Sequence, residues 1–122
     1  MDSKDSELEM RIRVPSRKIR EKFLLTYELE GCQRAVNFLT RYYGIRRMKI
    51  VLDGRRVGNG NIACYDRNRA YFTKKGLTRR TILHELYHHL IDAKNVEIPV
   101  KREEKEANNY ARGFIKYKSR SL

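Results

Sequence analysis

Three residues near the middle of the chain have the types and spacing of a hydrolytic metal site: His84, Glu85 and His88. They form an H-E-x-x-H motif in a stretch that predicts a helix, where residues four positions apart share one face with Cβ atoms about 5–6 Å apart. Both imidazole rings can therefore reach one ion, and the glutamate can take a proton from a water that the ion activates. The motif predicts a zinc site with His84 and His88 as ligands and Glu85 as the general base.

A catalytic zinc ion usually has three protein ligands, so the motif needs one more. The chain contains only three histidines. His89 lies about 100° around the helix from His88, and we expect it to be a partly exposed polar residue rather than a ligand. The third ligand is therefore expected to be a carboxylate. Asp92 is expected to face solvent or to support the site from outside. The next predicted helix offers three better-placed carboxylates: Glu103, Glu104 and Glu106.

The helix that carries the motif is predicted to begin after Thr78, a good N-cap, and to end near Ala93. One side of its helical wheel is apolar, with Leu83, Leu86, Tyr87, Leu90 and Ile91. The opposite side is polar, with Thr81, His84, Glu85, His88 and Asp92. This separation predicts that the motif lies at the mouth of a cleft. The reaction also needs a hydrogen-bond donor for the developing oxyanion. The candidates are Tyr87, Tyr110 and an arginine, and the sequence does not choose among them. Both tyrosines lie on apolar stripes that favour core packing.

The other elements predict a single α+β domain. Helical patterns cover residues 17–29 and 32–43, either as two helices or as one long helix across Gly31. A strand is predicted within 46–52, and an antiparallel hairpin from 62–65 and 70–73 follows a glycine-rich loop. That loop is either a close backbone approach or an ordinary surface loop. The last helix begins near Lys101 and carries an apolar face of Ala107, Tyr110, Ala111 and Phe114.

The length of 122 residues suits one domain. We expect a mobile arm over residues 1–15, the domain over 16–117 and a frayed tail over 118–122. The chain has no apolar run of about 20 residues and its first residues do not form a secretory signal, so we expect a cytoplasmic protein. Cys32 and Cys64 are expected to be separate small buried thiols rather than a disulfide.

The formal net charge of +13 favours contact with polyanions, above all nucleic acid. A basic cluster precedes and opens the first helix: Arg11, Arg13, Arg17, Lys18 and Arg20. This cluster is either a nucleic-acid-binding arm or a solvated helix start. We slightly favour the solvated helix start, because no base-reading motif accompanies the charges.

The order of the predicted elements and two motifs resemble the minimal zincin metallopeptidases of the ImmA/IrrE group and, more weakly, the SprT-like domains. The first motif is H-E-L-Y-H at residues 84–88, and the second is E-K-E-A-N-N-Y-A at residues 104–111, which is similar to the family pattern E-x-E-A-N-x-F-A. The resemblance covers about residues 32–115. It implies a zincin-like fold with N-terminal helices, a small antiparallel or mixed sheet, the motif helix and a C-terminal glutamate-bearing helix.

The resemblance also implies roles for individual residues. It implies Zn²⁺ as the cofactor and a gluzincin-like ligand set in which Glu104 is the third ligand, with Glu103 and Glu106 as alternatives. Asn108, one turn from Glu104, would steady it. An edge strand before the motif helix would pair with an extended substrate by β-augmentation, and here that strand would be 62–65 or 70–73. Tyr87 departs from the pattern, because such families often have glycine there.

These observations lead to a hypothesis and an alternative. The hypothesis is a zinc-dependent endopeptidase that hydrolyses peptide bonds of a DNA-associated or regulatory protein, with Glu85 activating the attacking water and then protonating the leaving amine. The alternative is a basic nucleic-acid-binding module on a zincin scaffold with little or no peptidase turnover. The sequence does not indicate an oligomeric state.

Overall fold

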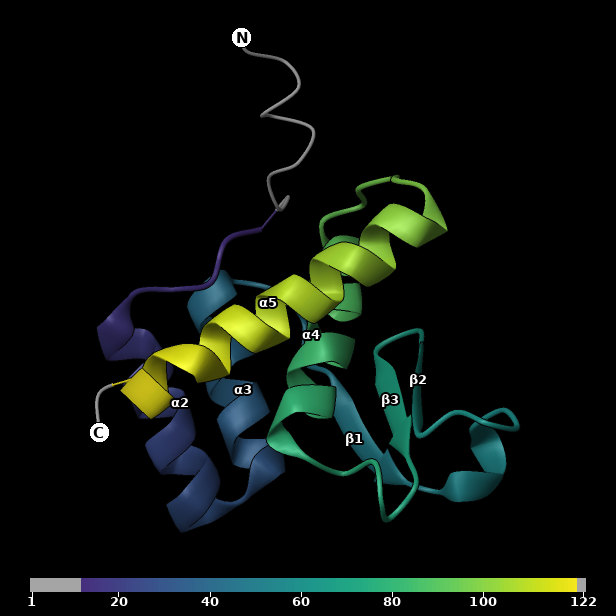
Figure 1. Cartoon of the computed structure of the whole chain (residues 1–122), viewed down its shortest axis with the longest axis horizontal. Helices are drawn as coiled ribbons and strands as arrows, with labels where there is room; N and C mark the ends of the chain where they lie inside the picture. The colour runs from purple at the N-terminus through teal and green to yellow at the C-terminus, as the bar shows by residue number, and fades with distance from the viewer. Residues whose placement is uncertain (1–11, 121–122) are drawn as a thin grey trace, which may run out of the picture.

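The structure of the chain, a computed structural model, describes residues 12–120, with side chains described as far as Ile115. Its elements are four α-helices, one short 3₁₀ helix and three strands, so the predicted α+β class is confirmed. In chain order they are α2 (Arg17–Glu30), α3 (Cys32–Tyr43), β1 (Lys49–Leu52), η1 (Gly54–Arg56), β2 (Ala63–Asp66), β3 (Arg69–Phe72), α4 (Arg79–Ala93) and α5 (Val100–Arg120). Figure 1 shows α2 and α3 side by side, with the sheet beyond α4.

Gly31 separates the first two helices, which settles the choice between two helices and one long helix. Its φ of 97° lies in a region that residues with a Cβ atom rarely adopt, so the chain turns sharply between Glu30 and Cys32. Gly44 ends α3 in the left-handed conformation, and the N–H of the following residue, Ile45, bonds to the carbonyl of Thr40. The two helices therefore pack as a compact pair.

The strands form a mixed sheet in the order β1-β3-β2. The chain turns from β2 into β3 through Arg67 and Asn68, which both have positive φ, as a tight two-residue hairpin turn requires. This confirms the antiparallel hairpin. β1 pairs with β3 in parallel and covers Lys49–Leu52, which lies within the predicted range of 46–52.

Helix α5 crosses α4 and reaches the N-terminal helices, as Figure 1 shows. The rings of Phe23 in α2 and Phe114 in α5 meet edge to face with centroids 5.1 Å apart. Both are fully buried, together with Leu39 of α3, Phe72 of β3 and Leu86 of α4. One core therefore joins all four helices to the sheet. The predicted apolar face of the last helix is confirmed, because Ala107, Tyr110, Ala111 and Phe114 are all buried.

Both ends of the predicted domain differ from the boundaries expected from the sequence. Residues 1–11 of the predicted arm lie outside the described part of the chain, whereas residues 12–15 pack against the domain. The Ile12 N–H donates to the hydroxyl of Tyr87 at 3.3 Å, and Pro15 is buried. At the other end, α5 continues as a helix to Arg120, past the predicted start of the tail, and residues 121–122 are outside the described range.

The predicted basic cluster is only partly available on the surface. Arg11 lies outside the described residues. Arg17 pairs with Glu21 on the same helix at 3.2 Å, and a guanidinium nitrogen of Arg20 donates to the carbonyl of Pro15 at 2.8 Å. Two of these cations therefore have partners within the protein.

Gly76 is the point where the loop before α4 meets β2. A Cβ atom at this position would lie 2.1 Å from the carbonyl oxygen of Ile62, so only glycine fits. The backbone N–H of Thr73, the residue after β3, donates a hydrogen bond to the same carbonyl oxygen at 3.0 Å. The close backbone approach is thus at Gly76, and the glycine-rich loop at 57–61 is a surface loop in which a Cβ on Gly60 would meet nothing within 4 Å.

Two further expectations concern the chain as a whole. Cys32 and Cys64 are separate thiols, as predicted, but both are half-buried rather than buried. Among residues 12–120, no helix combines the length and apolar character needed to cross a membrane.

Candidate metal centre

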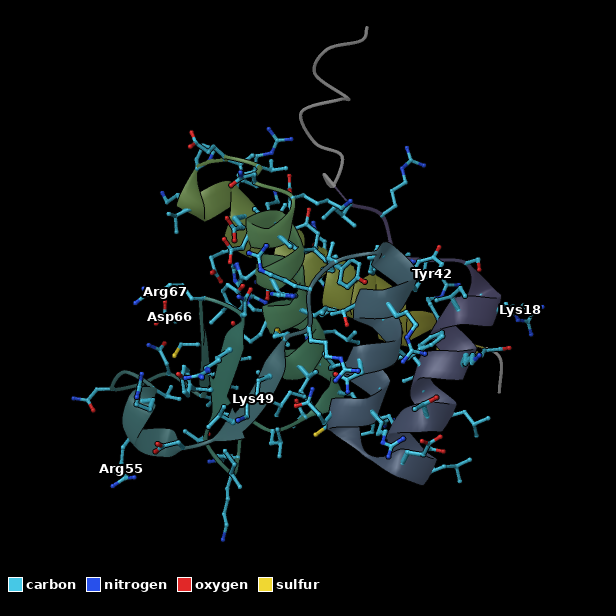
Figure 2. The ribbon with its side chains drawn as sticks, turned by 180° about the vertical axis from the view of Figure 1, so that it is seen from behind. Lys18, Tyr42, Lys49, Arg55, Asp66 and Arg67 are labelled. Atoms are coloured by element: carbon cyan, nitrogen blue, oxygen red, sulfur yellow. The ribbon has the colours of Figure 1, made fainter. Side chains whose placement is uncertain are left out.

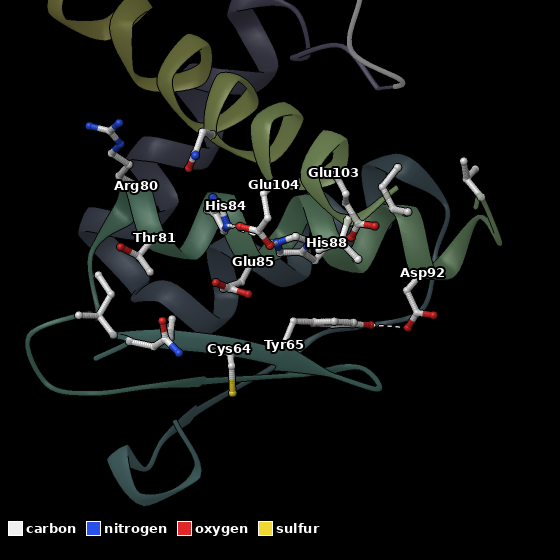
Figure 3. A pocket seen from close by; sticks show the side chains of 17 residues that line it. Cys64, Tyr65, Arg80, Thr81, His84, Glu85, His88, Asp92, Glu103 and Glu104 are labelled. Carbon is white, nitrogen blue, oxygen red and sulfur yellow. Dashed lines mark hydrogen bonds and ion pairs between the residues drawn. The ribbon is translucent and has the colours of Figure 1, made fainter. Parts of the chain in front are cut away.

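Helix α4 positions the motif. Thr78 is its N-cap, and the Thr78 side chain accepts a hydrogen bond from the N–H of Thr81 at 3.2 Å, as predicted. The predicted apolar side is confirmed, because Leu83, Leu86, Tyr87, Leu90 and Ile91 are all buried. Figure 3 shows His84, Glu85 and His88 projecting from α4 into a cleft whose other walls are the β2 strand and the start of α5.

Three side chains from two helices converge in this cleft. The Nε2 atoms of His84 and His88 lie 3.2 Å apart. Glu104 of α5 faces both, with one carboxylate oxygen 3.1 Å from His84 Nε2 and the other 2.8 Å from His88 Nε2. These ligand atoms form a group that could hold a metal ion, with all of them within 4.8 Å of one another.

The arrangement fits a zinc ion by its chemistry and by its dimensions. Two imidazole nitrogens and one carboxylate are a donor set found in catalytic zinc sites, which keep a further position open. Ligand atoms about 2.1 Å from a tetrahedral zinc ion lie about 3.4 Å from one another. The two histidine nitrogens are 3.2 Å apart, and each lies 2.8–3.1 Å from an oxygen of the Glu104 carboxylate, which is close to this spacing.

The structure distinguishes the three glutamates that the sequence left open. Glu104 is the one whose carboxylate faces both histidines. Glu103 instead contacts the other ring nitrogen of His88, with its oxygen 2.5 Å from Nδ1. Glu106 is buried on a different side of α5, where it accepts hydrogen bonds from Tyr87 and Arg102 at 2.7 Å each. Glu106 therefore takes no part in the cluster.

Burial sets the protonation of two motif residues. Glu85 is only 6% exposed, and burial raises the pKa of its carboxyl to about 7, with the charge of Glu104 adding to the effect and that of His88 opposing it. Burial, together with the neighbouring His88, lowers the pKa of His84, although the charge of Glu104 and the hydrogen bonds of His84 with Asn108 and Glu104 oppose this. A neutral His84 has a lone pair available for a metal. Asn108, expected to steady Glu104, contacts His84.

Comparisons of this chain with protein-family models, with curated proteins and with solved structures give no significant match. We therefore infer what the site does from its geometry.

The cleft has a volume of about 960 Å³, and residues 61–65, which include most of β2, form one of its walls. In the described chain no strand pairs with the edge of β2 away from β3. Because hydrogen-bonded pairs alternate along an antiparallel ladder, the bond from Thr73 N–H to Ile62 implies that the backbone groups of Ala63 and Tyr65 point away from β3. They are available to an extended chain lying in the cleft.

The remaining strands do not offer such an edge. β3 lies between β1 and β2, so the expectation that 70–73 is an edge strand is wrong. The outer edge of β1 is occupied by Gln33 of α3, whose amide donates to the carbonyl of Met48 at 3.0 Å and accepts from the N–H of Ile50 at 2.8 Å. This use of Gln33 carries no recognisable signal in the sequence, because its partners are backbone groups 15 and 17 residues away.

The expectation for His89 is also wrong, because its side chain is fully buried. Its Nε2–H donates to the carbonyl of Arg46 at 2.7 Å, and its Nδ1 lies 2.9 Å from the hydroxyl of Tyr65. The helical wheel places His89 away from His88 correctly, but it cannot show that the loop before β1 and the β2 strand cover that side of α4. His89 supports the packing of the sheet on α4.

Tyr65 links the sheet to the far end of the motif helix. Its hydroxyl donates to Asp92 at 2.6 Å and accepts from the N–H of Asn68 at 2.9 Å. Burial and the bond to Asp92 raise the pKa of Tyr65 well above its ordinary value, so it keeps this proton. Asp92 also pairs with Arg46 at 3.3 Å, and it therefore lies outside the histidine cluster, as expected. The sequence analysis did not identify this role of Tyr65. The only signal for it is the inward position of Tyr65 in a half-buried strand.

The tyrosines considered as oxyanion donors are in the core. Tyr87 donates its hydroxyl to Glu106, and the hydroxyl of Tyr110 bonds to that of Tyr43 at 2.7 Å. Both rings are fully buried, and neither residue lines the cleft. Arg80, in the first turn of α4, is the one arginine among the described residues that line it.

Proposed function

We propose that this chain is a zinc-dependent endopeptidase with a zincin-like fold, similar to the minimal peptidases of the ImmA/IrrE group. One observation carries the proposal: the facing nitrogens of His84 and His88, both opposite the carboxylate of Glu104, stand beside the buried Glu85 in an open cleft. A zinc ion held by such a set polarises a peptide carbonyl and makes a nearby water acidic enough to be deprotonated near neutral pH.

The residues of the candidate site have three different tasks in this reaction. His84, His88 and Glu104 hold the ion, and Glu103 orients the ring of His88 through Nδ1. Glu85 accepts the proton of the attacking water and then gives it to the leaving amine.

The substrate of this proposal is an extended segment of a polypeptide. Backbone groups of Ala63 and Tyr65 on β2 can pair with such a segment as an added strand. The segment would then lie along the cleft, between β2 and the motif face of α4, with its peptide bonds beside Glu85.

Zinc binding is the first test. The metal-free full chain is titrated with zinc against a chromophoric chelator, and we expect one ion per chain. His88→Ala should weaken the affinity by more than about 100-fold, because two ligands hold zinc far less tightly than three. Glu97→Gln is a matched control, since Glu97 is exposed and does not line the cleft. Failure to take up stoichiometric zinc would contradict the proposal.

Peptide hydrolysis is the second test, with an unfolded fluorescent casein as the probe. We expect zinc-dependent cleavage by the wild type and by Glu97→Gln. Glu85→Gln should retain zinc but lose about 100-fold or more in rate, because the amide cannot accept the proton. Cleavage that survives this substitution would exclude Glu85 as the base.

A further inference from the structure

The face of the sheet opposite α4 carries a basic groove, which is separate from the metal centre. It has a volume of about 700 Å³ and is walled by α3, β1, β3, η1 and the turn between β2 and β3. Its basic side chains, called the basic groove residues below, are Arg47, Lys49, Arg56, Arg67 and Arg69. One acidic residue, Asp66, lines the same groove. Figure 2 shows Lys49 on this face, with Asp66 and Arg67 at the adjoining turn.

The sheet register places two of these cations, Lys49 and Arg69, side by side. Lys49 is the direct partner of Arg69 in the parallel β1–β3 pair, so their side chains leave the same face. Tyr71 follows two positions after Arg69 and faces the same way, whereas Ala70 and Phe72 point into the core. Because like charges directly opposite one another on a sheet are destabilising, this placement has a cost that an anion would relieve.

Three of the cations have no carboxylate partner in the structure. Among residues 12–120, no acidic group lies within ion-pair distance of Arg47, Lys49 or Arg69, and all three side chains are exposed. The single acidic residue of the groove is already engaged, since Asp66 pairs with Arg67 at 3.5 Å. The unpaired positive charge of the groove therefore comes from these three side chains.

A fourth cation is held in a fixed orientation. The guanidinium of Arg56 stacks over the ring of Tyr71, 4.8 Å from its centroid, and one of its nitrogens lies 3.4 Å from the Tyr71 hydroxyl. Tyr71 is 6% exposed, so the guanidinium forms the surface there. A planar guanidinium fixed in this way suits bidentate contact with a phosphate group and can stack on a base.

These features favour one class of ligand. A groove with several unpaired cations and a stacked planar group is the arrangement that follows the backbone of a single nucleic acid strand. A duplex is too broad for a groove of this volume. An acidic peptide would satisfy the charges, but it has no planar bases to use the guanidinium of Arg56.

We propose that the basic groove binds the phosphodiester backbone of single-stranded nucleic acid. The inference does not depend on the peptidase activity, because the groove and the cleft lie on opposite faces of the sheet. It also uses residues other than the basic cluster at 11–20. A peptidase with this groove would act on proteins bound to a nucleic acid strand that it holds itself.

The test compares two variants that lose the same charge. The groove variant is Arg47→Gln, Lys49→Gln and Arg69→Gln, and the control variant is Lys74→Gln, Lys94→Gln and Lys105→Gln, which are exposed residues outside the groove. Fluorescence anisotropy measures binding of the full chain to labelled twelve-nucleotide oligouridylate and oligothymidylate at several salt concentrations. We expect the groove variant to bind about tenfold or more weakly, and its log–log salt slope to fall by about 2, for three lost phosphate contacts. The control variant should stay within about threefold of wild type.

Four outcomes of this experiment support or overturn the proposal that the basic groove binds single-stranded nucleic acid. Groove-dependent binding of either oligonucleotide supports the proposal, and the stronger of the two identifies the strand as RNA or DNA. Equal weakening of both variants would overturn it, because the affinity would then come from diffuse charge. Equal or tighter binding of a labelled oligoglutamate would overturn it in favour of an acidic peptide, and equal or tighter binding of a duplex would overturn the single-strand assignment. The groove variant should cleave casein at the wild-type rate, and Glu85→Gln should bind the oligonucleotides normally, which separates this result from the peptidase test.

Discussion

At the scale of single residues, His88 is the most constrained member of the site. One ring nitrogen faces His84 and Glu104, and the other is 2.5 Å from a carboxylate oxygen of Glu103. A carboxylate in that position fixes the ring orientation of a histidine ligand and makes the coordinating nitrogen a better donor. Glu103 and Glu104, adjacent in the sequence, thus serve the same histidine from two sides.

Replacement of Glu103 tests its positioning role. Glu103→Gln should weaken zinc affinity by about 10–100-fold, because the amide supports the histidine less strongly than the carboxylate does. Chelator competition measures the affinity, and Glu97→Gln is the exposed control. Glu104→Gln should cause a larger loss. Equal affinity of Glu103→Gln and wild type would assign the Glu103 contact no role in metal binding.

The buried carboxyl of Glu85 makes the stability of the metal-free protein depend on pH. Its pKa is about 7 in the folded chain, against an ordinary value of 4.5 in the unfolded chain. The folded state therefore holds a proton that the unfolded state releases, so stability falls as the pH rises from about 4.5 to about 7. Above pH 7 the full cost of the buried charge remains.

Glu85→Gln should remove this dependence. We expect the metal-free variant to be more stable than wild type by about 3 kcal/mol at pH 8 and by less than about 1 kcal/mol at pH 5. Urea unfolding at the two pH values provides both free energies. The same difference at both pH values would show that Glu85 is not buried as a proton-holding carboxyl.

At the scale of elements, α4 is covered on three sides, and a different set of its residues is contacted on each side. The β2 strand and the loop before β1 cover His89. Helix α5 approaches His84 and His88. The leucines of α4 are buried in the core. Before α4 begins, Gly76 lets the chain pass close to the carbonyl of Ile62.

Gly76→Ala tests how the loop places α4. The added Cβ would lie 2.1 Å from the Ile62 carbonyl oxygen, so backbone must move, and we expect a loss of about 1–3 kcal/mol in the free energy of unfolding. Gly58→Ala is the matched control, because its Cβ would meet only the end of the Asn61 side chain at 3.3 Å. Urea unfolding of both variants measures the difference. Similar stability of the two would exclude a strict requirement for glycine at 76.

At the scale of the whole molecule, the candidate site joins two helices that are separate in the sequence. His84 and His88 come from α4 and Glu104 from α5, so a bound ion connects the two helices. Such an ion stabilises only the folded chain, in which the three ligands are together.

Zinc should therefore raise the thermal stability of the protein. At a free zinc concentration about 100 times Kd, the expected stabilisation is about 2.7 kcal/mol, and a chelator should reverse it. Scanning calorimetry measures the shift in Tm, with His88→Ala as the variant in which the shift is lost. A shift of equal size in that variant would indicate zinc binding elsewhere.

The sequence alone predicted the elements and the motif, because these depend on local pattern. The period of apolar residues in α4 and α5 and the cap at Thr78 act within a few residues, and the structure has each of them as expected. The helix break at Gly31 is also local, although the sequence left it open against one long helix. The spacing of His84 and His88 follows from the helix repeat alone.

Tertiary structure decided what these elements meet. The choice among Glu103, Glu104 and Glu106 depends on the rotation of α5 against α4, and the burial of His89 depends on a strand and a loop that approach from elsewhere in the chain. The basic groove likewise requires the parallel pairing that sets Lys49 beside Arg69. Helical and strand periods repeat along one element, whereas the orientation between two elements is set by the packing of many side chains, which no short pattern contains.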